Sequence, residues 1–103
     1  STHDPNELDI ALAMKPDYVA LGPVFPTTLK QLDWAPQGVA RVTEWKKRVG
    51  PVPLVAIGGL NIERAQSVLE AGADSAAVST DVLGNPDPEA RAREWVALSR
   101  ARG

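Results

Sequence analysis

Short segments that are typical of buried strands alternate along this chain with segments of helical periodicity. The strand-like segments are residues 17–22, 52–57 and 74–78. The middle one reads Val-Pro-Leu-Val-Ala-Ile and is apolar on both faces, which is typical of a parallel sheet covered by helices. Because helical crossovers join parallel strands, the alternation predicts a parallel α/β fold.

Four helical segments surround these strands, and each begins or ends at a recognisable residue. The sequence predicts helices over residues 4–14, 38–49, 61–72 and 87–99. Asp4 and Asn61 are expected to cap the first and third helices, since their side-chain oxygens can accept from free backbone N–H groups. Asp87 followed by proline is a typical start for the last helix.

Three strands are too few for an independent sheet of this kind. A closed parallel barrel needs eight strands in about 250 residues, whereas this chain has 103 residues and neither an internal repeat nor an interdomain linker. An open three-stranded sheet would leave two unpaired edges. Residues 1–103 are therefore interpreted as the second half of a larger α/β fold.

Composition narrows the class of protein. The chain has no cysteine, which excludes disulfides and thiolate-bound metals. A formal net charge of −2 provides no basic field for nucleic acid. No apolar run approaches the roughly 18 residues of a membrane span, and the first residues do not resemble a signal peptide. We therefore expect a cytoplasmic protein that binds neither nucleic acid nor membrane. No His, Asp and Glu cluster has metal-ligand spacing, so no metal ligand is predicted within the chain.

Two consecutive strand ends carry residues suited to binding phosphate. Gly58-Gly59 follows the second strand and lets the backbone approach an anion, while Ser79-Thr80 follows the third strand and offers N–H groups and hydroxyls. Parallel barrels often bind phosphate between the loops after two consecutive strands. Taken singly, the first pair is more simply explained as a tight turn and the second as a helix cap, but their occurrence after consecutive strands favours a phosphate site.

The long segment from Pro23 to Gln37 follows the first strand and is interpreted as functional, since loops of about 15 residues in compact domains usually are. Lys30 lies in it, and a lysine suits a pyrophosphate or a departing oxyanion as a point charge. A solvated surface lysine is the alternative. His3 is the only histidine, and a structural role is its alternative. Trp45 and Trp95 are expected to be packing residues.

Together these segments resemble thiamine phosphate synthase (thiamine-phosphate pyrophosphorylase). The resemblance covers essentially the whole chain, but only the C-terminal half of that enzyme. It rests on the following motifs: Ser1-Thr2-His3, Gly22-Pro23-Val24-Phe25-Pro26-Thr27-Thr28 with Lys30, Gln37-Gly38, Val55-Ala56-Ile57-Gly58-Gly59, and Ala71-Gly72-Ala73-Asp74.

The resemblance implies a (β/α)8 TIM barrel, of which residues 1–103 are the C-terminal part of a single domain. It implies a transferase of thiamine biosynthesis, which joins 4-amino-2-methyl-5-pyrimidinylmethyl diphosphate to a thiazole phosphate and releases pyrophosphate. Mg²⁺ is the implied cofactor, with its ligands in the absent N-terminal half. This chain alone is therefore expected to be inactive, and to pair with that half or with itself.

The resemblance also assigns roles to individual residues. Ser1 would lie beside the pyrimidine and its diphosphate, and Lys30 would hold the diphosphate; these two are the catalytic candidates. The thiazole phosphate pocket would be formed by Thr27, Thr28, Leu29, Gly59, Ser79 and Thr80, the last three largely through backbone N–H groups. Leu29 stands where the family usually has a small hydroxyl residue.

Two alternatives remain open. A thiazole tautomerase-like paralogue would share the barrel and would use His3 as acid and base, although Pro23 and Pro26 favour the synthase. A non-catalytic phosphate-binding half-barrel, completed by another chain, is the second alternative.

Overall fold

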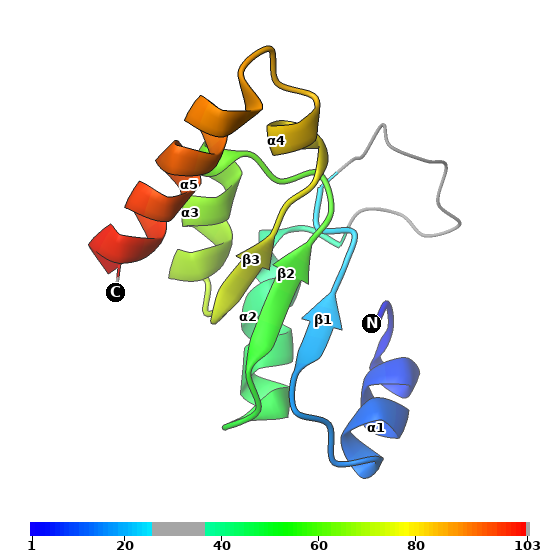
Figure 1. Cartoon of the computed structure of the whole chain (residues 1–103). Helices are drawn as coiled ribbons and strands as arrows, with labels where there is room; N and C mark the ends of the chain where they lie inside the picture. Colours follow the sequence, from blue (N-terminus) through cyan, green and yellow to red (C-terminus); the bar gives the residue numbers. More distant parts are fainter. Residues whose placement is uncertain (26–36, 103) are drawn as a thin grey trace.

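The computed structural model describes residues 1–25 and 37–102 (Figure 1). Helices and strands alternate as the sequence predicts. Their order is α1 Pro5–Ala13, β1 Val19–Leu21, α2 Val39–Val49, β2 Leu54–Ile57, α3 Ile62–Glu70, β3 Ser75–Ala77, α4 Thr80–Leu83 and α5 Pro88–Arg102. The strands are shorter than predicted, and α4 is an element that sequence periodicity did not reveal, because four residues make barely one turn.

The three strands form one parallel sheet in the order β1-β2-β3. Val19 pairs with Leu54, and Val55 pairs with Ser75. An isolated parallel bridge joins Thr2 to Leu21, so the N-terminal residues continue the sheet beyond β1. All three strands therefore end at the same edge, which lies at the top of Figure 1 beside α4.

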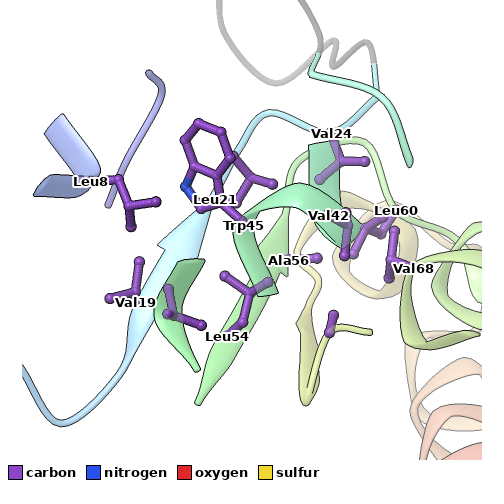
Figure 2. Packing of buried hydrophobic residues seen from close by; sticks show 12 residues of the cluster. Leu8, Val19, Leu21, Val24, Val42, Trp45, Leu54, Ala56, Leu60 and Val68 are labelled. Atoms are coloured by element: carbon purple, nitrogen blue, oxygen red, sulfur yellow. The ribbon is translucent and has the colours of Figure 1, made fainter. Parts of the chain in front are cut away.

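One face of the sheet packs against helices and forms the core. Side chains alternate along a strand, and here the buried set is Val19 and Leu21 of β1 with Leu54 and Ala56 of β2. Trp45 of α2 is wholly buried against this face (Figure 2). The remaining buried members of the cluster are Leu8, Val24, Val42, Val49, Leu60, Val68 and Ala73.

The opposite face is much less covered by the described residues. Ile57 at the end of β2 is 42% exposed, and Ser75 of β3 is also exposed. The apolar character of β2 on both faces is confirmed, but helices of the described chain bury only one of them. The expected parallel α/β fold is therefore present.

Local capping explains where the helices begin. The Asp4 carboxylate accepts from the backbone N–H of Glu7 at 2.8 Å, and the Asn61 amide oxygen accepts from that of Arg64 at 2.9 Å. Asp87 likewise accepts from the N–H of Ala90 at 3.1 Å. The caps at Asp4 and Asn61 are those that the sequence predicts, and Asp87 lies at the predicted start of the last helix.

Candidate functional site

The loops after β1 and β2 are fastened together at the carboxyl edge of the sheet. The N–H of Val24 donates to the carbonyl of Ile57 at 3.0 Å, and the N–H of Phe25 donates to that of Gly58 at 3.1 Å. Two glycines permit this approach. A Cβ at Gly22 would lie 2.6 Å from the Ile57 oxygen, and one at Gly58 would lie 2.6 Å from the Cα of Pro23. Residues 22–25 are therefore hydrogen-bonded to, and closely packed against, residues 57–58.

Arg64, in the first turn of α3, contacts one residue of each of these two loops. Its Nη1 donates to the carbonyl of Gly59 at 2.8 Å, and its guanidinium carbon lies 4.8 Å from the centre of the Phe25 ring. Gly59 has a φ of +68°, a conformation that glycine adopts readily. Arg64 therefore holds the glycine turn in place, a role that sequence reasoning missed.

The N-terminal residues are held beside β1 by Thr2, which is only 1% exposed. The Thr2 hydroxyl donates to the carbonyl of Ala20 at 2.6 Å and accepts from the indole N–H of Trp45 at 2.9 Å. Trp45 is thus a packing residue, as predicted, and also a donor. Ser1, which precedes Thr2, is exposed.

His3 and Gln37 connect this segment to the loop after β1. The Nδ1 atom of His3 lies 3.0 Å from a carboxylate oxygen of Glu7. The side-chain amide of Gln37 donates to the carbonyl of His3 at 2.8 Å, and its backbone N–H donates to that of Pro23 at 2.7 Å. The Gln37-Gly38 motif therefore closes the far end of the loop.

Ser79 and Thr80 lie after β3 at the start of α4. Both residues are exposed, and the Ser79 side chain makes no capping hydrogen bond to the helix. Because β2 and β3 are parallel, Gly59, Ser79 and Thr80, which follow these strands, lie at one edge of the sheet. Ser1 lies next to Thr2, which is bridged to Leu21 at the end of β1. Thr27, Thr28, Leu29 and Lys30 lie outside the described residues.

Asp81 links α4 to α5. Its carboxylate accepts from Nε and Nη2 of Arg91 at 2.8 and 3.0 Å, and from the indole N–H of Trp95 at 2.8 Å. The Arg91 hydrogen bonds are the main reason that the pKa of Asp81 is lowered from its ordinary value; Trp95 lowers it further, and partial burial opposes both. Trp95 is thus half-buried and hydrogen-bonded.

Asp74 lies at the opposite, amino edge of the sheet and is structural. One carboxylate oxygen accepts from Lys46 Nζ and from the N–H of Leu54, both at 2.8 Å. The Lys46 hydrogen bond is the main cause of a lowered Asp74 pKa, and the Leu54 N–H adds to it. The Ala-Gly-Ala-Asp segment thus fixes the start of β2 rather than the candidate site.

The described residues offer no metal centre and no membrane span. Among residues 1–25 and 37–102, no three His, Asp or Glu side chains come together in a way that could hold a metal ion. Nor is any helix in these ranges long and apolar enough to cross a membrane.

Parallel strands whose glycine- and hydroxyl-bearing loops gather at their carboxyl edge define the class: a β/α protein with a candidate anion site at the strand ends. Residues 1–82 match the family model described as thiamine monophosphate synthase. The chain belongs to this family.

Relatives agree with that assignment. The thiamine-phosphate synthase of Rhizobium etli is 69% identical over 96% of this chain and 48% of its own length, and that of Cronobacter sakazakii is 53% identical over 84% and 41%. Thiamine phosphate pyrophosphorylase from Pyrococcus furiosus superimposes with a TM-score of 0.80 at 31% identity, over 93% of this chain and 45% of that protein. The chain therefore spans about half the length of the relatives it matches, and their names favour a synthase over a tautomerase.

Proposed function

We propose that residues 1–103 form the C-terminal half of a thiamine-phosphate synthase barrel. The reaction would join 4-amino-2-methyl-5-pyrimidinylmethyl diphosphate to a thiazole phosphate. The observation that carries this proposal is the Gly58-Gly59 turn, which is clamped to the loop after β1 and lies one strand away from Ser79-Thr80. That arrangement suits a phosphate held mainly by backbone N–H groups.

The chain's own residues would bind and orient both substrates. Backbone N–H groups of Gly59, Ser79 and Thr80 would hold the thiazole phosphate, with Thr27, Thr28 and Leu29 completing its pocket. Ser1 would lie beside the pyrimidine, at the edge where Thr2 fixes the N-terminal segment.

Lys30 would stabilise the negative charge that develops as the diphosphate departs. The carbon–oxygen bond breaks with its electron pair remaining on pyrophosphate, which leaves a pyrimidine carbocation. The thiazole nitrogen then donates its lone pair to that carbon, and the new carbon–nitrogen bond yields thiamine phosphate.

The described residues do not fit the Mg²⁺ site that the family resemblance implies, since they lack a cluster of suitable ligands. The family resemblance implies that those ligands lie in the N-terminal half of the barrel. The substrates proposed are small molecules; an N-terminal half-barrel, or a second copy, is the proposed macromolecular partner.

The open features of the sheet support a half-barrel. The second face leaves Ile57 42% exposed, and the described residues pair no strand with the outer edge of β3. A cavity of about 470 Å³ lies beside that edge, between α3 and α5. Further strands and helices would cover this face and this edge.

The test is an assay of the complete barrel with both substrates and Mg²⁺, comparing wild type with Lys30→Ala. We expect thiamine phosphate from the wild type and a kcat about 10²–10³ lower in the variant, with a smaller effect on thiazole phosphate binding. Lys15→Ala is the matched control, since Lys15 follows α1 and is exposed. An inactive wild-type barrel would refute the function, and full turnover by Lys30→Ala would refute the role of Lys30.

Residues 1–103 alone should self-associate or fail to form a stable barrel, and should be inactive. Light scattering and the same assay check this. A stable, active monomer would refute the half-barrel, whereas recovery of activity on mixing with an N-terminal half would support it.

A further inference from the structure

The short helix α4 lacks the usual sources of helix stability. It has four residues, far fewer than an isolated helix needs in water. None of its residues is buried, and Leu83 is 76% exposed. Its first residue is preceded by Ser79, whose side chain forms no cap. Neither hydrophobic burial nor capping therefore holds α4 in position.

The carboxylate of Asp81 attaches α4 to α5 through hydrogen bonds. Three N–H groups of α5 reach it at 2.8 to 3.0 Å, two from the guanidinium of Arg91 and one from the indole of Trp95. The side chains of Asp81 and Arg91 are only 15% and 20% exposed. A bidentate guanidinium–carboxylate pair fixes direction as well as distance, and Glu94 holds Arg91 from the other side at 2.6 Å.

The same pair also controls charge near the proposed phosphate contacts. Asp81 is adjacent to Thr80, and an isolated carboxylate there would repel a phosphate. The guanidinium of Arg91 balances that charge at hydrogen-bond distance. Arg91, which also pairs with the exposed carboxylate of Glu94, therefore keeps the Asp81 carboxylate beside the strand-to-helix turn from being an uncompensated charge.

We propose that Asp81 is a positioning residue for thiazole phosphate binding, acting through Arg91 and Trp95 to hold the backbone of Ser79 and Thr80 in its binding geometry. This inference rests on the proposed function. Asp81 would not contact substrate itself. Its link to α5 would affect binding of the thiazole phosphate and not of the pyrimidine diphosphate.

The first experiment compares steady-state kinetics of the complete barrel carrying Asp81→Asn or Arg91→Met. Asp81→Asn should raise KM for the thiazole phosphate about tenfold, with kcat and the KM for the pyrimidine diphosphate changed less than about twofold. Arg91→Met should raise the same KM further, because it leaves the carboxylate uncompensated beside the phosphate. Glu89→Gln is the matched control, since Glu89 and Arg93 form an exposed pair within α5 alone; it should leave both KM values unchanged. Equal loss for both substrates, or an effect no larger than that of Glu89→Gln, would overturn the proposal.

The second experiment tests the link between Asp81 and α4 without any substrate. Hydrogen exchange of the Thr80–Leu83 amides is measured in the same barrel without substrate. We expect these amides to exchange about tenfold faster in Asp81→Asn, while β2 amides keep their protection. Unchanged exchange in α4 overturns the positioning role whatever the enzyme's substrate proves to be. If the wild-type barrel lacks synthase activity and the α4 amides still exchange faster in Asp81→Asn, the function is refuted and the link between Asp81 and α4 is supported.

Discussion

Gly58→Ala is the substitution whose cost the structure defines most directly. The φ of Gly58 is +105°, and its missing Cβ would lie 2.6 Å from the Cα of Pro23, 2.7 Å from its Cβ and 3.2 Å from the backbone nitrogen of Val24. The nearest of these atoms belong to backbone and to a proline ring, which cannot rotate away. The backbone of Pro23 and Val24 would therefore have to shift.

Two contributions set the magnitude. Backbone strain for a non-glycine residue with positive φ is about 1–2 kcal/mol, and an overpacked contact that shifts backbone adds about 1–3 kcal/mol. We expect a total loss of about 3 kcal/mol in the free energy of unfolding. In a barrel of roughly 200 residues this lowers Tm by about 6–12 °C.

Gly50→Ala is the control that separates these contributions. Gly50 has a φ of +60°, and among the described residues no atom lies within 4 Å of a Cβ built there. This variant therefore carries strain without a clash and should lose only about 1–2 kcal/mol. Calorimetry of both variants in the complete barrel measures the difference. Equal Tm values for Gly58→Ala and Gly50→Ala would show that the packing of Gly58 against Pro23 is not a constraint, and the reasoning would be wrong.

Three further outcomes are expected. Gly59→Val should weaken thiazole phosphate binding at least about tenfold, or about 1.4 kcal/mol, because a branched side chain would stand where the backbone meets the anion; unchanged affinity by titration calorimetry contradicts this placement. Thr2→Val should cost about 1–3 kcal/mol in unfolding free energy, because it leaves the Trp45 indole N–H unsatisfied. That loss should be smaller when Trp45→Phe is already present. Additive losses in denaturant titrations would rule out the hydrogen bond as the cause. Because the pKa of Asp74 is lowered in the native state, this carboxylate stays ionised there at pH values where the unfolded state, with a pKa near 3.8, takes up a proton. Its contribution to stability should therefore be constant above about pH 3.8 and should decrease below it. In a Tm–pH profile, Asp74→Asn should reduce this decrease.

Local patterns along the chain predict most of the fold. The caps at Asp4 and Asn61 form as expected, because a capping side chain reaches only two or three residues along the chain. Alternation of strand and helix likewise predicts parallel order and one common edge for the loops. The sequence alone therefore places Gly58-Gly59 and Ser79-Thr80 at a common edge of the sheet. The contacts of Thr27 to Lys30, outside the described residues, stay predictions.

Tertiary structure alone decides what holds those loops in place. The Asp81 carboxylate meets residues 10 and 14 positions away, and the Gln37 amide meets a carbonyl 34 positions away. Arg64 of α3 contacts the ring of Phe25, which lies in the loop after β1. No periodicity or spacing encodes such pairs, since each depends on how two elements dock. Short-range hydrogen bonds and alternating hydrophobicity determine the elements and their order, whereas burial of the shared face between sheet and helices determines which distant side chains meet.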